Sequence, residues 1–111
     1  MSVQQDMSKC DGKADGGKVR SSLLHTQFGE HLEGVAGVLT FGANKYPKPP
    51  LDNSWRDVPN GKQRYLDALY RHLTARFSRG EGNDAESGYD HVYHAMCNLL
   101  FLLELDKDVT K

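Results

Sequence analysis

The stretch DAESGYDHVYHAMCNLLFLLEL, from Asp84 to Leu105, decides the fold. Its second half is nearly all apolar, which predicts a buried helix that begins near Asn83 or Asp84 and ends near Leu105. Asn83 is the expected N-cap, and Glu86, three residues later, completes a capping box. On a helical wheel, the polar residues of this stretch fall on one face: Asp84, Ser87, His91, His94 and Asn98.

This polar stripe needs partners, because buried polar groups are seldom left unpaired. Another helix, another subunit, a ligand or a metal can supply them. Aspartate and histidine on one helix face are suitable ligands for a divalent cation such as Mg²⁺, Mn²⁺ or Co²⁺. Glu81, Glu86 and Asp90 add negative charge nearby. Two simpler interpretations stay open: Glu86 and Asp90 are acids favoured by a helix N-terminus, and His91 and His94 are core histidines that pair internally.

An earlier helix is predicted from Thr26 to Phe41. Its apolar residues recur at helical spacing, in the order Phe28, Leu32, Val35 and Leu39. Gly42 follows the last of them and is the expected C-terminal cap. Three internal glycines either weaken this helix or mark close packing against a neighbour: Gly29, Gly34 and Gly37.

A third helix is predicted from Lys62 to Phe77. Its apolar side carries Leu66, Leu69, Leu73 and Phe77, with Tyr70 beside them. Arg64 and Arg71 lie on the other side with Asp67 between them, and their guanidinium groups suit phosphate binding. The simpler alternative is an exposed Asp67–Arg71 pair, which contributes little. His72 is either a boundary residue or faces His91 and His94.

The segment NKYPKPPLDNSW, residues 44–55, is predicted to be a long ordered loop. Pro47, Pro49 and Pro50 exclude a helix and a central strand there. A nucleotide base could stack on Tyr46 or Trp55. Alternatively, Trp55 anchors the loop to the core.

Length and composition indicate one small all-α domain. The chain has 111 residues, 14 basic and 15 acidic, with a net charge of −1, which argues against a general nucleic-acid or membrane binder. Residues 1–20 are expected to form a flexible arm, 21–106 the helical domain and 107–111 a tail. Lys18 and Arg20 in the arm either reach over a site or belong to a simple leader. Because a core this small is marginal, we expect oligomers.

The two cysteines, Cys10 and Cys97, form no metal-binding pair and fit a reducing compartment. The first ten residues contain no apolar segment of a secretory signal. These features predict a cytoplasmic protein. The chain also lacks the P-loop, nucleophile-elbow and H-E-x-x-H motifs.

Several blocks in order resemble a small phage-borne family, described as the N-terminal domain of dATP/dGTP diphosphohydrolase. They are DGGKVRSSLL, VLTFGANKY, NSW, RYLDALYRHL, GEGNDAESG and HVYHAMCNLLFLL, and they cover residues 11–105. The resemblance implies a viral protein that acts on purine deoxynucleoside triphosphates. It also implies kinship with the all-α MazG-type pyrophosphohydrolases, which hold Mg²⁺ with acidic residues on neighbouring helices and form dimers or tetramers.

The chain departs from the MazG pattern in one respect. Glu30 and Glu33 match its E-x-x-E helix, but Glu86 and Asp90 are four apart, so the E-x-x-D helix is missing. Members of the family can also be the front part of a longer enzyme, in which case the activity can reside elsewhere in the protein.

The resulting hypothesis is a metal-dependent hydrolase of dATP or dGTP. Its expected catalytic residues are Glu81, Asp84, His91 and His94. Its expected metal ligands are His72, Asp84, His91 and His94. Its expected substrate-binding residues are Lys18, Arg20, Lys45, Tyr46, Trp55, Arg64, Arg71 and Asn98. The rivals are a non-catalytic module that sequesters a nucleotide or signalling molecule, and a purely structural oligomer.

Overall fold

The computed structural model describes the backbone of residues 16–110 and the side chains of residues 16–107. This part of the chain is helical, as predicted, and its only β-type pairing is an isolated bridge between Asn83 and Asp90. The elements are α2 (Ser21–Lys45), the 3₁₀-helix η1 (Ser54–Asp57), α3 (Gly61–Leu73), the π-helix η2 (Thr74–Ser78) and α4 (His91–Thr110).

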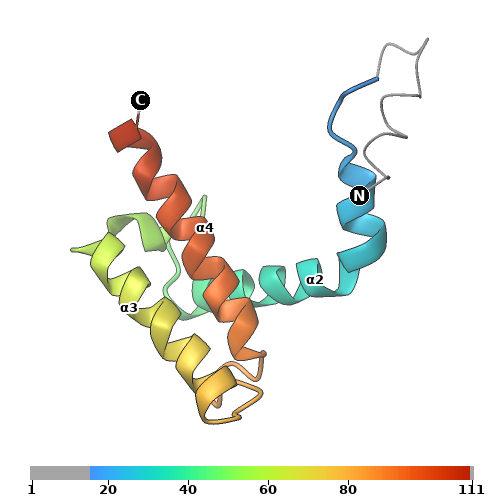
Figure 1. The fold of residues 1–111 in the computed structure, drawn as a ribbon. Helices are drawn as coiled ribbons and strands as arrows, with labels where there is room; N and C mark the ends of the chain where they lie inside the picture. The colour runs from blue at the N-terminus through green and yellow to red at the C-terminus, as the bar shows by residue number, and fades with distance from the viewer. Residues whose placement is uncertain (1–15, 111) are drawn as a thin grey trace.

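Helices α3 and α4 run side by side as a hairpin, and α2 crosses the lower half of α4 (Figure 1). Leu69 of α3, Ala75 of η2 and Ala95 of α4 are buried. Val35 and Val38 of α2 form a second buried group with Cys97 of α4. Both groups lie against α4, which explains why its sequence is apolar on nearly every side.

Two glycines let α2 approach α4 and the turn that precedes it, as one of the two interpretations predicted. A Cβ added at Gly34 would lie 2.3 Å from the Tyr93 ring, and one added at Gly37 would lie 2.3 Å from the Tyr89 ring. Gly29 has no such neighbour within 4 Å. Close packing therefore accounts for Gly34 and Gly37 and not for Gly29.

Helix α2 differs from the prediction in length and in its apolar face. It is longer at both ends than the predicted 26–41, and it is kinked at Phe28, where φ is −128° and ψ is 23°. Gly42 lies inside the helix and does not cap it, since its carbonyl accepts a 2.9 Å hydrogen bond from the N–H of Tyr46. Phe28 and Leu39 are exposed. Phe28 is exposed at the kink itself, and Leu39 lies just past Val38, the last buried residue of α2.

Helix α3 begins within one residue of its predicted start, and the π-helix η2 continues it to Ser78. Leu69 is buried as predicted, but Phe77 and Tyr70 are exposed. A π-turn contains more residues than an α-turn, so the change rotates the last residues away from the expected face.

Helix α4 begins at His91, well after the predicted Asn83 or Asp84. Its N-cap is Asp90, whose Oδ1 accepts a 2.8 Å hydrogen bond from the N–H of Val92. The predicted capping box of Asn83 and Glu86 is therefore wrong. Gly88, with φ of +79°, ends the preceding turn and separates it from the helix. The helix continues to Thr110, so residues 107–110 are helical.

The segment between α2 and η1 leads to Trp55, which fixes it against the helical hairpin. The Trp55 ring stacks on Phe101 of α4 with centroids 4.7 Å apart. The Tyr65 hydroxyl of α3 donates a 2.7 Å hydrogen bond to the Trp55 carbonyl. Trp55 is thus an anchor, the second of its two predicted roles. No helix among the described residues has the length and apolarity needed to cross a membrane.

Candidate metal centre

Three histidines from two helices meet at one end of the hairpin. His72 lies in the last turn of α3, and His91 and His94 lie at the start of α4. Nδ1 of His72 is 2.8 Å from Nδ1 of His91, and the rings of His72 and His94 stack with centroids 4.5 Å apart. Nitrogens this close must share a proton or a cation, because two lone pairs would repel each other. Of its two predicted positions, His72 takes the one that faces the other histidines.

The connection between η2 and α4 brings Asp84 and Ser87 to these histidines. Asp84 Oδ2 accepts hydrogen bonds from the N–H groups of Ser87 (2.9 Å) and Glu86 (3.2 Å). The same oxygen is 3.8 Å from Nε2 of His94, and Ser87 Oγ is 2.7 Å from that nitrogen. Asp84 and Ser87 therefore reach the histidines from a turn, and not from the helix face on which the helical wheel placed them.

His72, Asp84 and His91 form a candidate cation site. Each offers one ligand atom, and these three atoms lie within 4.8 Å of one another. Within the described residues it is the one group of three or more potential ligands with this geometry. Two imidazole nitrogens and a carboxylate oxygen are a suitable donor set for a divalent transition metal. The residues present therefore fit such a cation.

The site holds its groups in the protonation states that metal binding needs. Burial, with repulsion from His94 and His91, lowers the pKa of His72 to about 4. Burial likewise lowers the pKa of His94. For Asp84, burial raises the pKa, but the backbone hydrogen bond from Ser87 and the charge of His94 outweigh it, so the pKa lies below its usual value. Near neutral pH, His72 and His94 are therefore neutral and Asp84 is ionised, as metal ligands must be.

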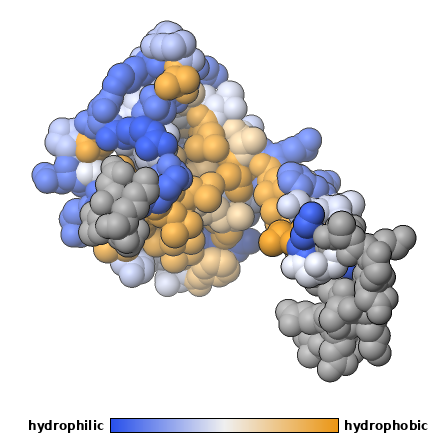
Figure 2. All heavy atoms as spheres, turned by 90° about the horizontal axis from the view of Figure 1, so that it is seen from above, coloured by the Kyte–Doolittle hydropathy of each residue, from blue (hydrophilic) through white to orange (hydrophobic). Residues whose placement is uncertain are grey.

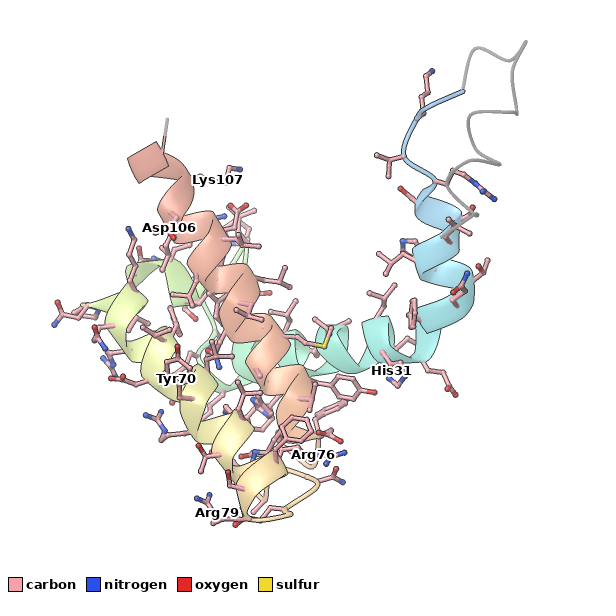
Figure 3. All side chains as sticks on the ribbon, in the orientation of Figure 1. His31, Tyr70, Arg76, Arg79, Asp106 and Lys107 are labelled. Atoms are coloured by element: carbon pink, nitrogen blue, oxygen red, sulfur yellow. The ribbon has the colours of Figure 1, made fainter. Side chains whose placement is uncertain are left out.

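Three ion pairs surround the histidines. They are Lys45–Glu86, Arg76–Asp90 at 3.1 Å and Arg79–Glu81 at 2.8 Å. Glu81 Oε1 also lies 3.7 Å from Nε2 of His91. Figure 3 shows Arg76 and Arg79 at this end of the hairpin. Neither arginine was among the residues predicted from the sequence, where the available signal is a pair of basic residues just before an acidic turn.

Other predicted binding residues lie outside this cluster. Arg64 and Arg71 are exposed on α3, and within the described chain neither forms an ion pair. The Asp67–Arg71 pair is not formed, because Asp67 accepts a 3.1 Å hydrogen bond from Gln63 instead. Arg71 lines a shallow hollow on α3 with Asp67, Tyr70, Thr74 and Arg79.

Lys18 and Arg20 are exposed just before α2, at the end that projects away from the hairpin (Figure 1). Tyr46 is also exposed, and Nζ of Lys45 lies 5.3 Å from its ring centroid. Asn98 is buried one turn after His94. The structure thus gathers His72, Glu81, Asp84, His91 and His94, with Lys45 at the rim.

Comparisons with known proteins identify the family of this chain. The family model described as dATP/dGTP diphosphohydrolase, N-terminal, matches residues 8–111. The chain belongs to this family. A dATP/dGTP diphosphohydrolase of Salmonella phage PMBT28 is 33% identical over 93 residues, which is 84% of this chain. The chain spans only 29% of that relative's length. No solved structure matches the chain.

Proposed function

We propose that this family member hydrolyses purine deoxynucleoside triphosphates, dATP or dGTP, with a divalent cation. The observation that supports this proposal is the convergence of His72, Asp84 and His91, from three separate segments, on one cation-sized site. The name of the phage relative supplies the substrate class.

In the proposed reaction, water attacks the α-phosphorus and the bond to the bridging α–β oxygen breaks, which yields a deoxynucleoside monophosphate and pyrophosphate. When bound, the cation would activate water and neutralise charge that develops on the phosphate. His72, Asp84 and His91 would hold it. His94 is the proposed general base, since its Nε2 is neutral and fixed by the Ser87 hydroxyl. Glu81 would orient His91.

The donor set favours Mn²⁺ or Co²⁺ over Mg²⁺. Imidazole nitrogen binds transition metals well, whereas Mg²⁺ prefers carboxylate, phosphate and water oxygens. Two of the three candidate ligands are histidines. We therefore expect Mg²⁺ to support less activity at equal concentration.

The rim cations are the proposed phosphate ligands. Lys45 and Arg79 are each paired with an exposed glutamate, and exposed ion pairs contribute little, so a polyphosphate can replace Glu86 and Glu81 at small cost. Tyr46 lies beside Lys45 and offers an open ring for the base. Five further residues remain proposed substrate ligands: Arg64, Arg71, Lys18, Arg20 and Asn98. Lys18 and Arg20 can reach the site only from another subunit or after a movement of α2.

The test is hydrolysis of dATP and dGTP by the full chain with Mn²⁺, Co²⁺ or Mg²⁺. Asp84→Asn and His91→Gln should each lower the rate by about 100-fold or more, because the cation loses a ligand. His25→Gln is the matched control, since His25 is exposed on α2 and should leave the rate unchanged. If the folded protein releases no product from any deoxynucleoside triphosphate, the hydrolase proposal is wrong.

The second candidate is a module that binds a nucleotide or signalling molecule without turnover. It is favoured by one fact: the chain corresponds to only 29% of the phage relative, so the relative's hydrolytic chemistry can lie elsewhere. It predicts that nucleotide raises the melting temperature while no product forms.

We also propose that the protein acts as a homo-oligomer, a dimer or tetramer, in the cytoplasm of a phage-infected cell.

A further inference from the structure

Among the described residues, the outer segment of α2, residues 21–30, forms no hydrogen bond, ion pair or ring contact with another element. His31 is the first residue of α2 that does so, through its 2.7 Å hydrogen bond with Tyr93 of α4. All buried residues of α2 lie between Gly34 and Val38. Beyond the kink at Phe28, the helix projects away from the hairpin (Figure 1). The radius of gyration is 17.6 Å, whereas a compact chain of this length has about 13 Å. A short helix alone in water is only marginally stable, so this segment needs a contact that the described residues of the single chain do not provide.

The outer segment presents an apolar face of its own. Leu24 and Phe28 are four residues apart, so they lie on the same side of the helix, and about half of each is exposed (49% and 50%). Within a protein whose core is small, two large apolar side chains left in water on one helix face indicate a binding surface.

A second apolar surface lies on α4, on the side that neither α2 nor α3 covers. Its leucine face consists of Leu99, Leu100 and Leu103, which are 49%, 46% and 67% exposed. Leu99 and Leu100 precede Leu103 by four and three residues, so the three side chains form one patch. Figure 2 shows hydrophobic side chains gathered in a band across the body of the molecule.

We propose that the outer segment of α2 in one copy of this chain packs on the leucine face of α4 in a second copy, and that the exchange is reciprocal. Each surface is apolar and lacks a partner among the described residues of its own chain, and a helix ridge on a helix face is an ordinary packing mode. Burying Leu24, Phe28 and the leucine face in both copies removes on the order of 1,000 Å² from water, which is the lower limit for a specific interface.

The leucine face of α4 is better covered by the outer segment of α2 from a second copy than by that of the same chain. The inner half of α2 is fixed on α4 by Val35, Val38 and the close contact of Gly34 with Tyr93. The exchange would also carry Lys18 and Arg20, which precede the outer segment, onto the neighbouring subunit. This inference rests on the homo-oligomer part of the proposed function and not on hydrolysis.

Light scattering after size exclusion tests the interface with the full chain. We expect the unmodified protein to have twice the mass of one chain or more. Leu24→Glu/Phe28→Glu and Leu99→Glu/Leu103→Glu should each give folded monomers, as judged by circular dichroism. Leu51→Glu is the control, because Leu51 is 74% exposed on the connection before η1 and belongs to neither surface. It should leave the assembly unchanged.

Cross-linking tests the reciprocal exchange and does not depend on charge-introducing variants. Two proteins that each carry one introduced cysteine, Leu24→Cys and Leu103→Cys, are prepared with Cys10→Ser and mixed under oxidation. Each also retains Cys97, which is buried. A disulfide-linked dimer should form in the mixture at several times the yield of either protein alone. Three results would each overturn the proposal. The unmodified protein could be a monomer, the Leu24→Glu/Phe28→Glu variant could remain a dimer, or the mixture could give no more disulfide-linked dimer than either protein alone. A dimer that hydrolyses no nucleotide contradicts the hydrolase and leaves this interface standing.

Discussion

At the scale of single residues, Gly34 shows how closely α2 approaches α4. A Cβ at this position would lie 2.3 Å from the Tyr93 ring, and that ring is also held by the hydrogen bond between its hydroxyl and Nδ1 of His31 (2.7 Å). Gly34→Ala should therefore lower the free energy of unfolding by about 1–3 kcal/mol, the usual cost of overpacking. Urea denaturation measures this change.

Gly29→Ala is the matched control for that prediction. It makes the same substitution in the same helix, but nothing lies within 4 Å of the added carbon. Because alanine favours helix more than glycine does, we expect Gly29→Ala to stabilise the protein by about 0.5–1 kcal/mol. Equal effects of the two substitutions would show that helix propensity, and not contact with Tyr93, governs Gly34.

The histidine cluster makes stability depend on pH. In the folded state the pKa of His72 is about 4, against 6.5 in the unfolded chain. Between these values the unfolded state binds more protons, so the free energy of unfolding falls as pH falls from about 6.5 to about 4. Burial lowers the pKa of His94 and adds to the same trend.

Urea midpoints of the metal-free protein, measured with a chelator between pH 7.5 and pH 5, test this dependence. We expect the midpoint to decrease steadily toward acid in the unmodified protein. His72→Gln removes one of the titrating groups and should show a smaller decrease over the same range. A steeper or identical decrease in His72→Gln would contradict the assignment.

At the scale of elements, Asp90 determines where α4 begins. It accepts the N–H of Val92 and pairs with Arg76 of η2, so it joins the cap of one helix to the end of another. Asp90→Ala should lower the free energy of unfolding by about 1–2 kcal/mol through loss of the cap. Asp90→Asn keeps a capping oxygen and should lose less.

Glu86→Gln is the control for Asp90→Ala, because the capping box predicted for Glu86 is absent. Glu86 is exposed and pairs with Lys45 instead, so its substitution should change the free energy of unfolding by no more than about 0.5 kcal/mol. Thermal or urea denaturation of the three variants separates the two positions. A larger effect of Glu86→Gln than of Asp90→Ala would show that the helix begins earlier than described.

At the scale of the whole molecule, a bound cation would join three segments that are far apart in sequence. His72 ends α3, Asp84 lies in the turn, and His91 begins α4. Ligands that bind only the folded state raise its stability, so Mn²⁺ or Co²⁺ should raise the melting temperature, and a chelator should reverse the rise.

The same experiment with Asp84→Asn tests whether the stabilisation comes from this site. That variant should lose most of the metal-dependent rise, whereas His25→Gln should keep it. Stabilisation of equal size in all three proteins would place the cation elsewhere. Because melting is read without substrate, this prediction holds or fails independently of hydrolysis.

The helices themselves were predictable from sequence, because periodic apolar residues and glycine breaks are local signals. The positions of the helix ends were harder to predict. The start of α4 was placed too early because Glu86 matches a capping pattern, while the true cap, Asp90, is selected by contact with Arg76, 14 residues away. Phe28 was wrongly placed on the buried face of α2 because the helix is kinked at this residue, which periodicity alone does not reveal.

The sequence by itself determined the helical class and the chemical types present: histidines, acids and a serine concentrated in one stretch. Local spacing carries that information, since residues near in sequence stay near in a helix or turn. Only the tertiary structure decided that His72 joins His91 and Asp84, that Trp55 serves as an anchor, and that the outer segment of α2 stands free. Those outcomes depend on how α3, α4 and α2 pack together, and packing is set by contacts between residues that are distant in the sequence.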